Sequence, residues 1–121
     1  MAKILIVDDE KMICEAFQDV LREEDHEVDI ALDGIEALKM VDNKAYDLIF
    51  LDVLMPRMEG REVFEAVRKK SEVPIAFMSG YMPRHKEKEV LLLGAVACLR
   101  KPIDLHQVKG LINTVTSGKS K

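Results

Sequence analysis

The sequence predicts an α/β fold in which helices cover both faces of a mainly parallel sheet. Short apolar or β-branched runs of four or five residues alternate with longer stretches in which apolar residues recur at helical spacing. This strand-then-helix pattern occurs five times along a chain of 121 residues. Strands that are each followed by a helix are joined by right-handed crossovers, and such crossovers produce a parallel sheet with helices on both sides.

Five runs have the composition of strands, and each is bounded by turn residues or charges. They are Ile4–Val7, Val28–Leu32, Leu48–Leu51, Ile75–Met78 and Val96–Leu99. The third run is apolar throughout, which is typical of a central parallel strand that is buried on both faces. The second run begins with Val28, Asp29 and Ile30, and this alternation of apolar and acidic residues favours a position at the edge of the sheet.

Five stretches have the spacing of helices with one apolar face. The first two are defined by Met12, Ile13, Ala16, Phe17, Val20 and Leu21, then by Ile35, Leu38 and Val41. The other three are defined by Val63, Phe64 and Val67, by Val90–Leu93 after the charged run Arg84–Glu89, and by Leu105, Val108, Leu111, Ile112 and Val115. Asp33-Gly34 and Leu93-Gly94 supply residues that are typical of helix boundaries.

The length and the order of the elements predict a single domain over residues 1–121. The best match is a flavodoxin-like (βα)5 three-layer sandwich, with a five-stranded parallel sheet in the order 2-1-3-4-5. We find no internal linker, repeat or low-complexity segment. Only residues 117–121 have the polar composition of a loose C-terminal tail.

The composition narrows the classes of function. The chain has 18 Lys and Arg against 22 Asp and Glu, a formal net charge of −4, and this argues against direct binding to nucleic acid or to a membrane surface. No run approaches the ~18 apolar residues of a membrane span. Two cysteines, Cys14 and Cys98, are too few for a disulfide framework, and a strand-like run opens the sequence instead of a signal peptide. We therefore expect a reducing cytoplasm.

Polar residues follow four of the predicted strands, on the side where ligands bind in such a sheet. Asp8 and Asp9 follow the first strand, Asp52 the third, Ser79 the fourth and Lys101 the fifth. Each of these residues alone would be read as a helix cap, a turn residue or a surface charge. Three carboxylates together repel one another unless a cation is present, and an all-oxygen set suits Mg²⁺, with Mn²⁺ as the alternative ion. A carboxylate beside Mg²⁺, a hydroxyl and an ammonium can accept a phosphoryl group.

Motifs along almost the whole chain resemble the receiver domain of bacterial two-component response regulators. They are Ile4-Leu-Ile-Val-Asp-Asp-Glu10, Asp47-Leu-Ile-Phe-Leu-Asp52-Val-Leu-Met-Pro56, Gly60, Ser79-Gly-Tyr81, Gly94-Ala95 and Lys101-Pro102. The resemblance implies a signalling switch that accepts phosphate on Asp52 from a phosphohistidine. The donor would be a sensor histidine kinase or a histidine phosphotransfer protein.

The resemblance also assigns the metal ligands. Asp9 and Asp52 would bind Mg²⁺ directly, together with the backbone carbonyl of Leu54. Asp8 would hold a metal-bound water molecule. Lys101 would pair with the phosphoryl group, and a cis peptide bond would precede Pro102.

The switch residues follow from the same resemblance. Ser79 would move to hydrogen-bond the phosphoryl group. Many receivers have Tyr or Phe three residues before the lysine, whereas this chain has Cys98, which we expect to be an inert buried thiol. Leu54 and Tyr81 flank the path of water to the acceptor, and we hypothesise that they lengthen the lifetime of the aspartyl-phosphate.

The partners implied by the resemblance are proteins. Met12, Ile13 and Ile103 are the candidate contacts with the kinase, and the output would be a downstream protein target or an effector domain outside this sequence. Such a domain assists its own phosphorylation and hydrolysis but turns over no separate substrate, so we do not expect an enzyme. None of His26, His85 and His106 has metal-ligand spacing, and we expect all three at the solvated surface.

Two other readings remain open. A degenerate receiver would act only as a protein-binding module, although every acidic, hydroxyl and lysine position of the motif is filled. A phosphatase of the haloacid-dehalogenase type would use the same strand-end chemistry. Its Asp-x-Asp signature, however, would need an acid where this chain has Leu54.

Overall fold

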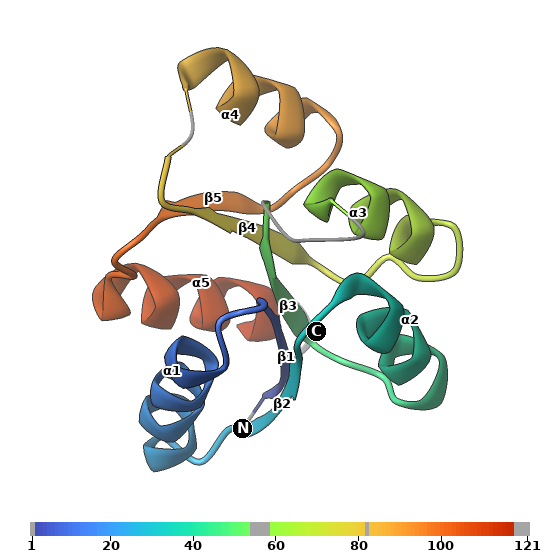
Figure 1. Ribbon diagram of the computed structural model, residues 1–121. Coiled ribbons are helices and arrows are strands. Elements are labelled where there is room, and N and C mark those ends of the chain that lie inside the picture. The colour runs from blue at the N-terminus through green and yellow to red at the C-terminus, as the bar shows by residue number, and fades with distance from the viewer. Residues whose placement is uncertain (1, 54–58, 82, 118–121) are drawn as a thin grey trace.

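The computed structural model describes residues 2–53, 59–81 and 83–117. In this part of the chain, five strands alternate with five helices (Figure 1). The strands are β1 (Lys3–Val7), β2 (Glu27–Ala31), β3 (Leu48–Asp52), β4 (Ile75–Ser79) and β5 (Ala97–Arg100). The helices are α1 (Lys11–Glu23), α2 (Gly34–Asn43), α3 (Gly60–Arg68), α4 (Arg84–Leu92) and α5 (Leu105–Ser117).

The strands form one parallel sheet in the order β2-β1-β3-β4-β5, which confirms the predicted flavodoxin-like fold. β2 lies at the edge, as its alternating sequence indicates. Each predicted strand differs from the observed one by a single residue, at one end in β1, β3 and β4 and at both ends in β2 and β5. Val7, the last residue of β1, lies opposite Ala31 of β2 and Leu51 of β3, so the carboxyl ends of these strands lie together at one edge of the sheet.

Each face of the sheet has its own apolar core. One core joins side chains of β1, β3 and β4 to α2, α3 and α4, and the other joins the alternate side chains of the strands to α1 and α5 (Figure 1). Every residue of β3 and β4 is buried, because these strands are covered on both faces. The core therefore fixes the strand ends on which the polar residues lie.

The helices differ from the sequence prediction in which apolar residues they bury. α1 buries Cys14, Phe17 and Leu21, whereas Met12 is 84% exposed. An α-helix turns by about 100° per residue, so Met12 points almost opposite to Cys14. Ile35 of α2 and Leu105 of α5 are also exposed, so the apolar stripes that we predicted for these helices were wrong at these positions.

The helix boundaries explain one acidic position and one glycine position. Asp33 caps α2, because its side chain accepts a hydrogen bond of 2.8 Å from the backbone N–H of Glu36. Gly94 follows α4 with φ of +112°, a conformation that side chains with a Cβ rarely adopt. Ser117 ends α5, and the rest of the predicted tail lies outside the described residues. No helix within the described ranges has the length and apolar character needed to cross a membrane.

Candidate functional site

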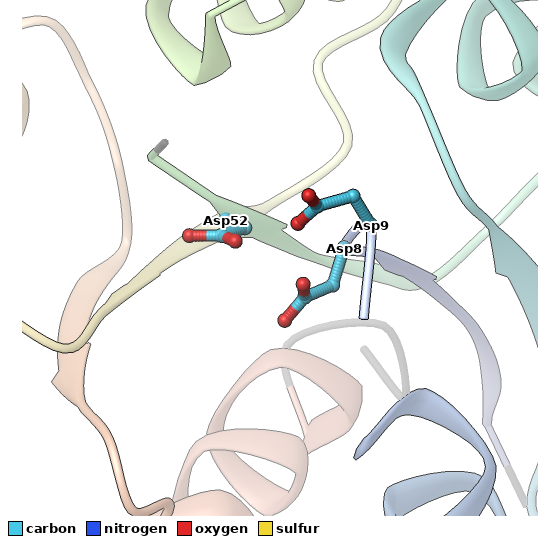
Figure 2. A group of neighbouring side chains, drawn as sticks. All are labelled: Asp8, Asp9 and Asp52. Carbon is cyan, nitrogen blue, oxygen red and sulfur yellow. The ribbon is translucent and has the colours of Figure 1, made fainter. Parts of the chain in front are cut away.

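Three aspartates meet at the carboxyl ends of β1 and β3. Asp8 and Asp9 follow β1, and Asp52 is the last residue of β3, which pairs with β1. One carboxylate oxygen of each aspartate lies within 4.8 Å of an oxygen of the other two (Figure 2). Asp8 and Asp52 are buried, whereas Asp9 is exposed. The cluster therefore combines two desolvated carboxylates with one that faces solvent.

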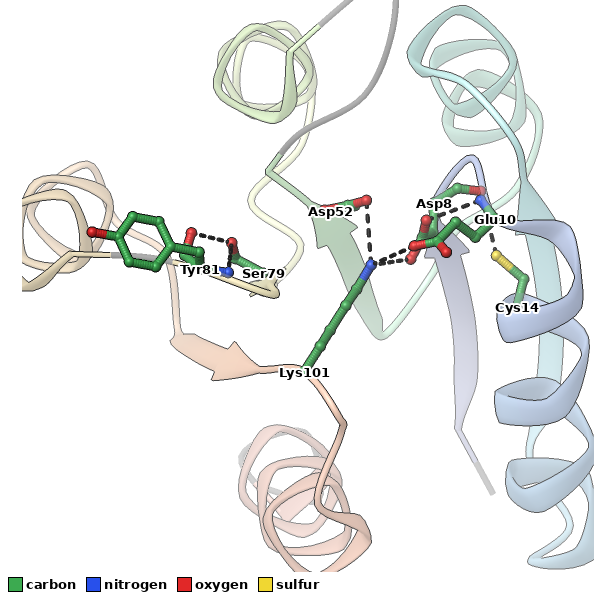
Figure 3. Close-up of polar contacts among 7 residues, drawn as sticks. All are labelled: Asp8, Glu10, Cys14, Asp52, Ser79, Tyr81 and Lys101. Atoms are coloured by element: carbon green, nitrogen blue, oxygen red, sulfur yellow. Dashed lines mark hydrogen bonds and ion pairs between the residues drawn. The ribbon is translucent and has the colours of Figure 1, made fainter.

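The ammonium of Lys101 lies between these carboxylates. Its Nζ is 2.8 Å from Oδ2 of Asp8 and 3.4 Å from Oδ2 of Asp52 (Figure 3). Burial lowers the pKa of Lys101, but the hydrogen bond to Asp8 and the negative charge of Asp52 outweigh burial and raise this pKa above its ordinary value. Lys101 is therefore a stable cation that partly neutralises the two buried acids.

Ser79 ends β4 on the other side of Asp52. Its hydroxyl donates a hydrogen bond of 2.6 Å to the carbonyl of Tyr81 and accepts one of 3.1 Å from the N–H of the same residue. Ser79 and Gly80 line a surface hollow of about 330 Å³ together with Asp9, Glu10, Asp52 and Lys101. The hydroxyl thus borders the hollow while it is held by the backbone of the following turn.

The side chain of Tyr81 lies away from this hollow. It is 76% exposed, and Figure 3 shows its ring pointing away from Asp52. This position gives no support to the predicted role of Tyr81 in shielding the acceptor from water. The corresponding prediction for Leu54, and the metal contact predicted for its carbonyl, lie outside the described residues.

Gly60 brings the start of α3 directly against the strand that carries Asp52. A Cβ at Gly60 would lie 2.5 Å from the carbonyl oxygen of Asp52 and 2.9 Å from Cα of Val53. Its N–H donates a hydrogen bond of 3.0 Å to the carbonyl of Val53. Only glycine fits this approach without moving the backbone, so the motif residue Gly60 has a steric explanation.

The donor set of the cluster fits a hard divalent cation. Asp8, Asp9 and Asp52 offer only carboxylate oxygens, the ligands that Mg²⁺ and Mn²⁺ prefer, and no nitrogen or sulfur group belongs to the set. The hollow leaves the cluster open to solvent on the side of Asp9. These three residues can therefore hold such a cation and still leave space for a phosphate oxygen.

The two cysteines lie on opposite faces of the sheet. Cys14 lies on the buried face of α1, and its thiol donates a hydrogen bond of 3.3 Å to the carbonyl of Asp8. Burial, and then the charge of Asp8, raise the pKa of Cys14 to about 12. Cys98 is half-buried against the other core, and burial followed by the charge of Glu87 raises its pKa to about 11. Neither environment favours a thiolate. Cys98 is half-buried instead of buried as expected, and its inertness stays a prediction.

The three predicted docking residues lie on one side of the site. Met12 and Ile13 are exposed at the start of α1. Ile13 and Ile103 line an apolar hollow of about 230 Å³, which also includes Phe17. The Lys101–Pro102 peptide bond beside it is cis, as predicted.

Sequence reasoning missed two contacts at the site. Glu10 lies 3.4 Å from Nζ of Lys101 and adds a third carboxylate around this ammonium. The acidic run that begins at Asp8 contained a signal for it, since Glu10 is its third member. The bond between Ser79 and the backbone of Tyr81 had no such signal, because main-chain groups are the same in every residue.

Comparison with known proteins gives a consistent result. The family model of the response regulator receiver domain matches residues 4–113. The transcriptional regulatory protein DltR of Streptococcus agalactiae is 33% identical over 119 residues, which are 98% of this chain and 53% of that protein. SpaR of Bacillus subtilis is 35% identical over 113 residues, 93% of this chain and 51% of that protein. The chain thus spans about half the length of these curated relatives.

Solved structures agree with the fold. The receiver domain of the Francisella response regulator 1452 has a TM-score of 0.91 at 26% identity, and the match covers both chains completely. The response regulator TrrA of Thermotoga maritima, solved in complex with Mg(2+)-BeF, has a TM-score of 0.82 at 34% identity over 95% of this chain and 99% of that one. The chain belongs to the family of response regulator receiver domains.

Proposed function

We propose that this chain is a phosphoryl-accepting switch in which Asp52 takes a phosphoryl group from the phosphohistidine of a sensor kinase or a histidine phosphotransfer protein. The observation that carries the proposal is the position of Asp52. Its carboxylate is buried at the end of a central strand, yet it borders an open hollow beside the Lys101 ammonium. A nucleophile needs this combination of fixed geometry, nearby positive charge and access.

The transfer follows from the groups around the hollow. A carboxylate oxygen of Asp52 attacks phosphorus while the bond between phosphorus and the donor imidazole breaks, and the electron pair of that bond remains on the imidazole. The product is an acyl phosphate on Asp52. The Lys101 ammonium offsets the charge of the transferred group, and the Ser79 hydroxyl can donate to it after releasing the carbonyl of Tyr81.

Magnesium is part of this proposal. When bound, Mg²⁺ supplies positive charge that offsets both the acidic cluster and the incoming phosphoryl group. Asp9 and Asp52 would bind it directly and Asp8 through water, consistent with the all-oxygen donor set. The related receiver from Thermotoga maritima, solved in complex with Mg(2+)-BeF, supports the choice of ion.

The consequence of phosphorylation would be a change in the surface that other proteins bind. The kinase or phosphotransfer protein would contact Met12, Ile13 and Ile103. This encounter would take place in the cytoplasm. The response would appear in α4, β5 and α5, which lie beside Ser79 and Lys101. The target would be another protein or an effector domain beyond this sequence. The domain would assist its own phosphorylation and hydrolysis without turning over a separate substrate.

The test is phosphorylation by a small donor. The purified chain is incubated with Mg²⁺ and acetyl phosphate, and its intact mass is measured beside that of Asp52→Asn. We expect one added phosphoryl group that is absent in Asp52→Asn and in EDTA. A chain that gains no phosphate from acetyl phosphate or from a panel of phosphorylated sensor kinases would contradict the proposal and favour a receiver that only binds proteins.

A further inference from the structure

Glu10 contacts the catalytic lysine although the proposed reaction gives it no role. Its Oε1 is 3.4 Å from Nζ of Lys101, the same distance that separates this nitrogen from Oδ2 of Asp52. The side chain of Glu10 is 56% exposed, whereas those of Asp8 and Asp52 are 1% and 7% exposed. Glu10 is therefore the member of the three carboxylates around Lys101 that can be changed without disturbing a buried charge.

The position of Glu10 in the chain does not explain its side chain. Glu10 is the residue that precedes α1, but its carboxylate makes no capping hydrogen bond to the helix. Ser, Thr, Asp or Asn would cap a helix better at this position. The backbone N–H of Glu10 donates a hydrogen bond of 3.0 Å to Oδ1 of Asp8, and this bond fixes the turn without the side chain of Glu10. Among the described residues, the contact made by the Glu10 carboxylate is the ion pair with Lys101.

Glu10 and Asp52 compete for the ammonium of Lys101. In Figure 3 the dashed line from the ammonium to Asp52 runs in a different direction from the lines to Asp8 and Glu10, which run together. In the proposed transfer, Lys101 must approach the phosphoryl group that is forming on Asp52. That movement lengthens the contact with Glu10. A contact that is stronger in the ground state than in the transition state raises the barrier of the reaction.

We infer that Glu10 is a positioning residue that holds Lys101 away from Asp52 and thereby slows phosphorylation of this receiver. The inference rests on the proposed transfer to Asp52. The step itself is unchanged: Asp52 attacks phosphorus, and the leaving group departs with the electron pair of the broken bond. Glu10 sets the starting position of the lysine and does not touch the reacting atoms.

Phosphorylation rates of matched variants test this role. Glu10→Gln keeps the size of the side chain and removes its charge, and Glu23→Gln removes the same charge at the opposite end of α1, about 20 Å away by the helical rise. With acetyl phosphate and Mg²⁺, we expect Glu10→Gln to react about two- to fivefold faster than the wild type, the effect of one partly exposed ion pair. Glu23→Gln should react like the wild type. The acceleration should shrink at high ionic strength.

A third variant distinguishes two effects of the Glu10 charge: its contact with Lys101 and its repulsion of the anionic phosphodonor. Glu10→Asp keeps the charge but withdraws it from Lys101, because its side chain is one methylene shorter. We expect its rate to lie between those of the wild type and Glu10→Gln. A Glu10→Asp rate equal to that of the wild type would show that charge alone acts, and it would overturn the holding role.

An NMR measurement reports on the lysine directly, without turnover. The side-chain ammonium signal of Lys101, assigned with Lys101→Arg, should shift in Glu10→Gln and stay in place in Glu23→Gln. If the Lys101 signal does not move in Glu10→Gln, the role of Glu10 is overturned. The same holds if the wild type is phosphorylated normally and Glu10→Gln reacts no faster. In both cases the proposed function still stands. A wild type that accepts no phosphate from acetyl phosphate or a kinase would overturn both.

Discussion

α3 and α4 have the same length and cover the same face of the sheet, but they are attached to it very differently. Each helix has nine residues, and both contribute to the core that also includes α2. α3 buries Gly60, Val63, Phe64 and Val67, whereas α4 buries Val90 alone. Burial of apolar surface is the main source of helix stability in a domain of this size. The comparison therefore identifies α3 as fixed and α4 as weakly held.

Ring contacts and ion pairs strengthen the contrast. The ring of Phe64 stacks on Phe77 of β4 with 5.6 Å between ring centres, and the Arg68 guanidinium lies 4.8 Å from the centre of the Phe64 ring. α4 is attached to its surroundings by partly exposed ion pairs, Arg61–Glu89 at 2.7 Å and Arg100–Glu87 at 3.3 Å. Such pairs contribute little in water. A helix of low local stability beside Ser79 is suited to respond to a change at the site.

The largest expected effect is the loss of the α3 anchor. Phe64→Ala removes a ring that is 2% exposed and stacked on Phe77, so we expect the free energy of unfolding to fall by about 3–5 kcal/mol. Denaturation in urea, followed by circular dichroism, measures this change. Leu92→Ala is the control on α4, because Leu92 is 88% exposed and its replacement should stay within about 0.5 kcal/mol. Equal losses in the two variants would refute the contrast.

A smaller effect is expected at the single buried residue of α4. Val90→Ala removes two methyl groups from a side chain that is 7% exposed, which corresponds to about 1.5 kcal/mol. We expect amide hydrogen exchange to rise in α4 much more than in α3. A loss as large as that of Phe64→Ala, with faster exchange in both helices, would show that α4 is as firmly anchored as α3.

The sequence predicted one of these two helices better than the other. The stripe Val63, Phe64 and Val67 is buried as its spacing indicated. The run Val90–Leu93 indicated an apolar end of the helix after the charged run Arg84–Glu89, yet Leu91 and Leu92 are exposed. Spacing tells which residues share a face of a helix, but the distance between that face and the sheet depends on the tertiary structure.

The ion pair between the helices gives a third and weaker test. Glu89→Gln removes the ion pair between Arg61 of α3 and Glu89 of α4. Glu65→Gln instead removes the 3.2 Å ion pair between Arg61 and Glu65, both of which lie in α3. We expect a change in the free energy of unfolding below about 1 kcal/mol in both variants. Only Glu89→Gln should speed amide exchange in α4, by about two- to fivefold. The same acceleration in Glu65→Gln would mean that the bridge between the helices is unimportant.

The smallest effect is expected from mild acid, at a site remote from both helices. His26 is partly exposed, and its Nδ1 accepts a hydrogen bond of 3.0 Å from the N–H of Ala2. Burial, and then the positive N-terminus, lower its pKa below the ordinary value of 6.5. The unfolded chain therefore takes up a proton first, and stability should fall as the pH decreases below 6.5.

Thermal unfolding between pH 7 and pH 5 measures this loss against His26→Asn, whose side chain carries an acceptor but does not titrate there. The variant should show a flatter dependence on pH. Because His26 touches neither α3 nor α4, acid should leave the difference in exchange between these helices unchanged. An identical pH dependence in the variant would rule out His26 as the titrating group.

The candidate site was predicted more completely than its internal contacts. The ends of parallel strands bring Asp8, Asp9, Asp52, Ser79 and Lys101 to one edge, and strand order alone was enough to expect this. The pairing of Lys101 with Glu10, and that of Ser79 with a backbone group, depend on side-chain rotamers and turn geometry. These features follow from packing and were therefore not available from the sequence.

Amide hydrogen exchange before and after phosphorylation tests the central claim most directly, namely that Asp52 controls α4 through the site while α3 stays fixed. With acetyl phosphate and Mg²⁺, we predict a changed exchange rate in α4, little change in α3, and no change in either helix of Asp52→Asn. A phosphorylated chain in which α4 exchanges as before, or in which α3 changes as much as α4, would contradict the account.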